Sequence, residues 1–212
     1  MAIFLAMLLD GLDGRVARLT NTQSAFGAEY DSLSDMVSFG VAPALVVYQW
    51  SLVNLAEVSV FWGKLGWLAA FIYSTSTALR LARFNTQIGV ADKRYFQGFA
   101  CPAAAAVIMG AIWVCETYGI TGGEVVYPAL VLTLLAGGLM VSRFSYYSFK
   151  DIDMRKKVPF FVVLIVMLVF VFLSIEPPTV LFALAVLYML SGPVISLFRW
   201  NRKRQRRAES AD

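Results

Sequence analysis

Residues 10–35 read DGLDGRVARLTNTQSAFGAEYDSLSD, and they place four aspartates beside stretches apolar enough to lie in a lipid bilayer. A charged side chain at membrane depth is costly, so it usually faces a protein interior and has a function there. Asp10 and Asp13 are three residues apart and Asp31 and Asp35 are four apart, so each pair projects from one face of a helix. A polar turn over residues 20–25 joins the two faces, and we expect them to close on each other as an antiparallel helix pair.

Four carboxylates in a chain without histidine favour a hard divalent cation. Mg²⁺ and Mn²⁺ prefer oxygen ligands and are typically held by carboxylates together with substrate phosphates. Arg18 follows the first acidic pair by one to two helical turns, where its guanidinium could clamp a phosphate oxygen. Gly14 and Gly27 remove side chains where a bulky ligand would approach the backbone. The pattern therefore predicts a metal–diphosphate site at the mouth of a membrane bundle.

The motif has eight fixed positions over 26 residues and follows the spacing D-x2-D-G-x2-A-R-x8-G-x3-D-x3-D. Its members are Asp10, Asp13, Gly14, Ala17, Arg18, Gly27, Asp31 and Asp35. This pattern resembles the signature of the CDP-alcohol phosphotransferase family, integral membrane enzymes of phospholipid synthesis, and it is far more specific than a short glycine motif. Four further segments resemble the phosphatidylserine synthase branch: residues 31–44, 78–85, 93–98 and 141–150. The similarity runs from Leu5 to about Lys150.

The resemblance implies an all-α integral membrane enzyme that transfers the phosphatidyl group of CDP-diacylglycerol to L-serine and releases CMP. It implies that Mg²⁺ or Mn²⁺ occupies a two-ion site, with Asp10, Asp13, Asp31 and Asp35 as ligands and Asp35 also as the catalytic base. The residues implied to bind the CDP group are Asp10, Gly14, Ala17, Arg18 and Gly27. The resemblance further implies a homodimer embedded in membrane lipid.

Hydropathy predicts a bundle of about seven transmembrane helices. The chain has 212 residues, of which 59% are hydrophobic, and its mean hydropathy of +0.68 excludes an ordinary soluble globule. The predicted spans cover residues 2–18, 27–51, 65–83, 98–118, 124–141, 158–175 and 179–198. We expect one membrane domain over residues 1–198 and a basic cytoplasmic tail over residues 199–212. Pro43 should kink the second span or begin a broken turn just beyond Asp35. Family members usually carry a further helix before the motif. We expect that this helix is missing here.

The distribution of basic residues predicts the orientation. A net charge of +4 on a soluble surface would suggest nucleic acid as a partner, but here the basic residues cluster between apolar runs and point to a membrane face, with no nucleic acid. With the predicted spans, 17 of the 18 lysines and arginines fall on one side, and only Lys64 falls on the other. The positive-inside rule then predicts a multi-pass protein of the cytoplasmic membrane with its site open to the cytoplasm.

Arg80 and Arg83 end the third predicted span on the side of the aspartates and share one helical face. They are candidates for binding the serine carboxylate or a lipid phosphate, although the positive-inside rule alone explains them equally well. Cys101 and Cys115 lie 14 residues apart in one predicted helix. That spacing separates them by about 21 Å, too far for a disulfide, so we interpret both as small packing residues.

Two other functions compete with the favoured one. A sister transferase that accepts glycerol 3-phosphate or inositol phosphate would share all eight motif positions, so only the flanking segments argue for serine. A divalent-cation transporter could also gather aspartates in a membrane. It should place acids near the midplane of several helices, whereas these four sit toward one end of two neighbouring helices.

Overall fold

The structure is a computed structural model that describes residues 2–20, 24–86, 95–147 and 160–209. Apart from two three-residue strands, its regular elements are helices. In chain order they are α1 (Ala2–Leu19), α2 (Ala25–Asp35), the π-helical η1 (Met36–Val41), α3 (Ala42–Trp50), the 3₁₀ turn η2 (Leu52–Asn54), α4 (Leu55–Val58), α5 (Val60–Thr86), β1 (Tyr95–Gln97), α6 (Cys101–Thr117), α7 (Val126–Val141), β2 (Ser145–Tyr147), α8 (Phe160–Ile175) and α9 (Pro177–Glu209). The all-α expectation therefore holds for nearly all of the described fold.

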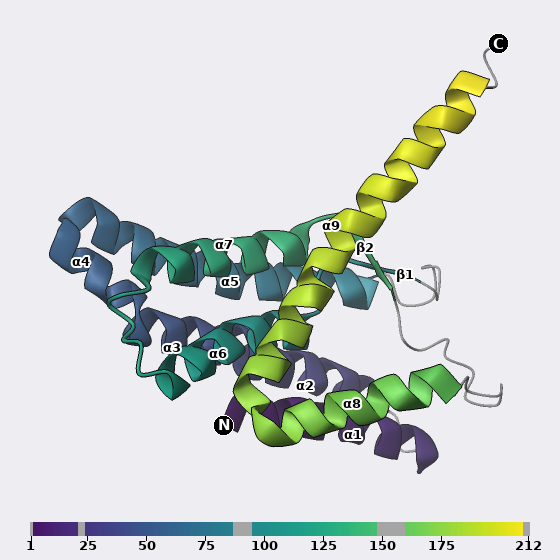
Figure 1. The fold of residues 1–212 in the computed structure, drawn as a ribbon, viewed down its shortest axis with the longest axis horizontal. Coiled ribbons are helices and arrows are strands. Elements are labelled where there is room, and N and C mark those ends of the chain that lie inside the picture. The colour runs from purple at the N-terminus through teal and green to yellow at the C-terminus, as the bar shows by residue number, and fades with distance from the viewer. Residues whose placement is uncertain (1, 21–23, 87–94, 148–159, 210–212) are drawn as a thin grey trace.

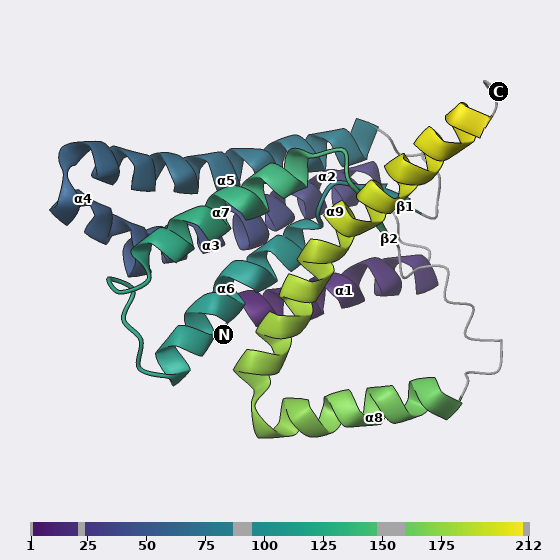
Figure 2. The ribbon, with the colours of Figure 1, turned by 45° about the horizontal axis from the view of Figure 1, so that its top comes forward.

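The helices pack in layers around one hydrophobic core. Helices α5 and α7 lie side by side, and η1, α3 and α6 pack beneath them (Figure 1). Helix α9 crosses α6, and its C-terminal part extends well beyond the rest of the bundle, while α8 meets the start of α9 and diverges from it (Figures 1 and 2). The core is filled by side chains from these layers, among them Phe39, Leu52, Tyr73, Ile108 and Met140.

Small residues let the main helices approach closely. A Cβ added at Gly137 of α7 would lie 3.3 Å from the Tyr73 Cα of α5, and one at Gly110 of α6 would lie 3.3 Å from the Phe182 Cα of α9. Helix pairs in membranes associate through this kind of close van der Waals packing, because lipid supplies little hydrophobic drive between them. The two glycines therefore set the α5–α7 and α6–α9 crossings.

An irregularity lies where Pro43 predicts one: the π-helical turn η1 follows Asp35 directly, although the helix itself continues from Ala25 to Trp50. Pro43 lacks an N–H and cannot donate to the Phe39 carbonyl four residues earlier. That buried carbonyl instead accepts a hydrogen bond of 2.9 Å from the Tyr73 hydroxyl of α5. Tyr73 thus supplies a hydrogen bond that the proline removes, and it ties the segment after Asp35 to α5.

We expect Tyr73→Phe to lower the free energy of unfolding by about 1–2 kcal/mol, because a buried carbonyl loses its donor. Thermal unfolding of the detergent-purified protein measures this. Tyr127→Phe is the matched control, since that residue lies exposed on α7. Equal melting temperatures for the two variants would contradict the assigned role of the Tyr73 hydroxyl.

A short antiparallel ribbon, which the hydropathy pattern did not predict, covers the end of the bundle. Tyr95, Phe96 and Gln97 of β1 pair with Tyr147, Tyr146 and Ser145 of β2. The Tyr146 side chain is fully buried, donates a hydrogen bond of 3.1 Å to the Met189 carbonyl of α9, and packs its ring against Phe99. Three-residue strands are too short to give a periodic hydropathy signal. The ribbon also depends on pairing between segments about 50 residues apart.

The expectation of seven membrane-crossing helices is not confirmed. Among the described residues, one helix (Pro177–Leu197) has the length and hydropathy to cross a membrane, and a second qualifies only if the bent pair Ala25–Trp50 and Leu52–Val58 counts as one span. Helices α6 and α7 are apolar but have 17 and 16 residues, against the ~20 that a perpendicular span requires. Helix α9 runs without interruption from its apolar part into the predicted basic tail, as far as Glu209, and the division at residue 198 stays a prediction.

Candidate active site

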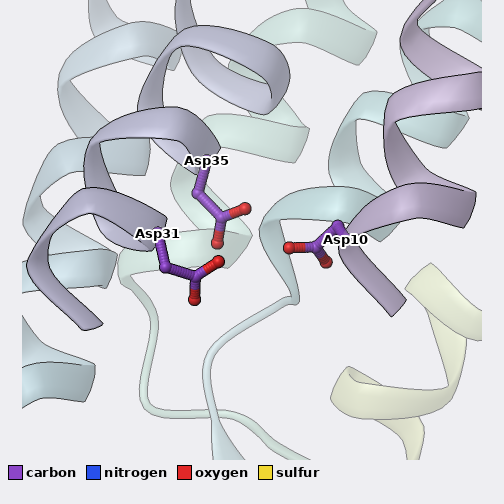
Figure 3. Close-up of side chains that lie close together, drawn as sticks. All are labelled: Asp10, Asp31 and Asp35. Atoms are coloured by element: carbon purple, nitrogen blue, oxygen red, sulfur yellow. The ribbon is translucent and has the colours of Figure 1, made fainter. Parts of the chain in front are cut away.

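Three of the four motif aspartates come together in space. Asp10 of α1 points across a gap toward Asp31 and Asp35 of α2 (Figure 3). One carboxylate oxygen from each lies within 4.8 Å of the others, with Asp10 and Asp35 half-buried and Asp31 exposed. Carboxylates this close repel one another, and either a shared proton or a bound cation relieves the repulsion. An all-oxygen donor set suits Mg²⁺ or Mn²⁺. The residues present therefore fit a hard divalent cation.

Local contacts hold α2 in place. The Ser24 hydroxyl caps the helix by accepting a hydrogen bond of 3.0 Å from the Gly27 N–H. Asn85 of α5 donates a hydrogen bond of 3.1 Å to the hydroxyl of Ser32, which directly follows Asp31 in α2. Asn85 belongs to the segment of residues 78–85, which resembles the phosphatidylserine synthase branch. Only the folded chain shows that Asn85 anchors the acidic helix α2.

Other members of the motif lie on the same two helices. Asp13, Gly14, Ala17 and Arg18 are on α1 within two turns of Asp10, but their side chains lie outside what the structure describes. Their proposed roles stay predictions. Gly27 is exposed in the first turn of α2, next to the capping Ser24 hydroxyl. Helix α1 itself packs against α6 and η1, which brings Asp10 opposite the second acidic pair.

The two candidate arginines of α5 have different surroundings. Arg83 donates hydrogen bonds through Nη1 to the carbonyls of Val141 (2.9 Å) and Ser142 (3.5 Å), and so ties α5 to the end of α7. Arg80 lies close enough to Asp35 for the two charges to interact. Its Nε is buried and has no hydrogen-bond partner in the described part of the chain. Arg80 is therefore the better placed of the two to bind an anion beside the acidic cluster.

Comparison with known proteins agrees with the motif. Residues 1–135 match the sequence model of the CDP-alcohol phosphatidyltransferase family. The chain belongs to this family. The resemblance read from residues 10–35 is thus confirmed, and the acidic cluster of this CDP-alcohol phosphatidyltransferase lies inside the matched region.

Relatives of this CDP-alcohol phosphatidyltransferase come from bacteria, archaea and yeast. A CDP-diacylglycerol–serine O-phosphatidyltransferase of Helicobacter pylori is 37% identical over 193 residues, which cover 91% of this chain and 77% of the relative. A protein of the same name from Methanocaldococcus jannaschii is 39% identical over 149 residues, covering 70% and 63%. One from Saccharomyces cerevisiae is 38% identical over 115 residues, covering 51% and 38%.

Proposed function

We propose that this chain transfers the phosphatidyl group of CDP-diacylglycerol to L-serine, giving phosphatidylserine and CMP. The observation that carries the proposal is the cluster of Asp10, Asp31 and Asp35, formed by the family motif in a chain whose relatives are named for this reaction. The cluster comes from two helices that meet at one site, which suits an enzyme better than a cation transporter with acids along several helices.

In the proposed reaction the serine hydroxyl oxygen attacks the phosphorus attached to diacylglycerol. The bond from that phosphorus to the bridging oxygen of the diphosphate breaks, and CMP leaves with the bonding electron pair. Asp35 takes the hydroxyl proton, and the glycines at positions 14 and 27, with Ala17 and Arg18, seat the CDP group. The proposed ligands of Mg²⁺ or Mn²⁺ are Asp10, Asp13, Asp31 and Asp35. The bound cation would neutralise the diphosphate and the departing phosphate oxygen.

Arg80 is the residue that we propose to bind the carboxylate of the acceptor serine. The Arg80 guanidinium keeps a buried N–H without a partner among the described residues, next to the acidic cluster where the serine hydroxyl must react. A guanidinium fits a carboxylate with two parallel hydrogen bonds. We expect Arg83 to stabilise the fold through its hydrogen bonds to the end of α7.

We expect Arg80→Ala to raise the KM for serine by about 10- to 100-fold, the loss of a hydrogen bond to a charged group, with a small change in the KM for CDP-diacylglycerol. Arg83→Ala is the matched control and should lower the melting temperature while leaving the serine KM near its normal value. Steady-state kinetics in mixed micelles measures both KM values. The assignment would be wrong if Arg83→Ala raised the serine KM and Arg80→Ala did not.

The acceptor itself is tested by supplying radiolabelled CDP-diacylglycerol to membranes that contain the chain. Serine, glycerol 3-phosphate and inositol phosphate are offered one at a time, and the lipid product is separated by chromatography. Phosphatidylserine as the main product supports the proposal. Faster product formation with either phosphorylated alcohol would place the chain with a sister transferase.

The environment is part of the proposal. The family is membrane-associated, and large apolar side chains on the described helices are exposed, for example Leu8 (69%), Met167 (65%) and Ile175 (74%). Such a surface suits lipid rather than water. We infer a multi-pass protein of the cytoplasmic membrane that works as a homodimer, and cross-linking in native membranes tests the dimer.

The cytoplasmic orientation of the site makes a separate prediction. The C-terminal ends of α5 and α7 lie near the β1–β2 ribbon, at the end of the bundle away from the start of α5 (Figures 1 and 2). Arg80 and Arg83 belong to the last two turns of α5, and Arg143 comes just after α7. A reporter fused after Asp212 should be cytoplasmic, and one inserted after the exposed Gly119 should lie outside. The reverse pattern would overturn the orientation.

A further inference from the structure

The first residue of α6, Cys101, is fully buried and touches the proposed acceptor-binding arginine. Its Sγ lies 3.1 Å from Arg80 Nη1. Sequence alone predicted only a packing residue. The structure agrees that Cys101 forms no disulfide, but it also places the sulfur at hydrogen-bonding distance from a guanidinium that interacts with Asp35.

The position of the Cys101 sulfur is determined by the backbone around it. The Phe99 N–H donates a hydrogen bond of 3.0 Å to the Leu139 carbonyl, and the Gly98 N–H donates one of 2.9 Å to the Phe144 carbonyl. Pro102 then restricts the first turn of α6. A cysteine side chain has one rotatable bond before the sulfur, so a fixed backbone leaves the sulfur few positions.

A thiol suits this contact because it orients the arginine without neutralising it. Sulfur is a weak, uncharged acceptor, so the guanidinium keeps its positive charge for a substrate. A carboxylate at the same place would form an ion pair and compete with the substrate. With Nη1 directed at the sulfur, Nε remains buried and without a hydrogen-bond partner among the described residues.

We propose that Cys101 is a positioning residue, whose sulfur holds the Arg80 guanidinium in the orientation that receives the carboxylate of the acceptor amino acid. This inference rests on the proposed function, because it requires serine as the acceptor. It adds a residue on α6 to a site whose motif lies on α1 and α2.

Cys101→Ala should raise the KM for serine about threefold to tenfold, the effect of one ordinary hydrogen bond. The KM for CDP-diacylglycerol should stay near its normal value. Cys101→Ser should restore the serine KM, because a hydroxyl oxygen accepts the same hydrogen bond. Cys115→Ala is the matched control, since this second cysteine of α6 lies four turns away and is only partly buried.

A double variant shows whether the sulfur acts through Arg80. In an Arg80→Ala background, Cys101→Ala should add nothing to the serine KM; a further increase by the same factor would overturn the proposal. An increase with Arg80→Ala but none with Cys101→Ala would overturn the proposal and leave the proposed function intact. An unmodified protein that makes no phosphatidylserine would overturn both. If Cys101→Ala lowers the melting temperature, the Cys101→Ser variant tests the proposal in its place. A folded Cys101→Ser protein with a raised KM for the substrate serine also overturns the proposal.

Discussion

Asp31→Asn should lower kcat by on the order of 10³-fold or more, since removing one carboxylate from a cation site costs several kcal/mol of transition-state stabilisation. Asparagine has nearly the same shape as aspartate, so the loss reports charge rather than packing. Asp31 is exposed and lies across from Asp10 in the acidic cluster (Figure 3). Turnover of CDP-diacylglycerol with saturating serine measures the effect.

Glu29→Gln is the control for this experiment, because Glu29 is an exposed acid on the same helix two residues away, where the helical period turns it to a different face. It should retain nearly full activity. Chelation of divalent cations should silence the unmodified enzyme, and added Mg²⁺ or Mn²⁺ should restore it. Full turnover in excess chelator would refute the cation site, whatever the effect of Asp31→Asn.

Gly98→Ala should prevent stable folding or lower the free energy of unfolding by more than about 3 kcal/mol. Gly98 has φ +84°, which an L side chain rarely adopts, and an added Cβ would lie 2.3 Å from the Met140 carbonyl oxygen. Backbone strain of this kind costs about 1–3 kcal/mol by itself. The contact adds to it, because the end of α7 must move to make room.

Gly119→Ala separates the two contributions. Gly119 has φ +70°, but an added Cβ there would meet nothing within 4 Å. This variant should suffer only the backbone strain and remain folded. Thermal unfolding and the yield of monodisperse protein in detergent compare the two variants. Equal losses would mean that the close approach of Gly98 to α7 contributes nothing to stability.

The family and the acidic character of the site could be predicted from the sequence because the motif is local. Eight positions within 26 residues specify which side chains face one another along two helices, and the helical period alone pairs Asp31 with Asp35. Pro43 similarly predicts the helical irregularity that follows Asp35, because the missing N–H is a property of the residue itself. The family and the acidic cluster follow from these short-range features.

The different roles of the two arginines could not be predicted from the sequence. Arg80 and Arg83 share a helical face, yet Arg83 is tied to Val141, 58 residues later, while Arg80 contacts Cys101 and lies near Asp35. The β1–β2 ribbon and the contact between Tyr73 and Phe39 likewise join segments far apart in the chain. The sequence by itself thus determined the motif, its helical faces and the family of the enzyme, since these depend on neighbours within a few turns. Only the tertiary structure decided which side chains meet across the core, because hydrogen bonds between distant segments depend on how the helices pack.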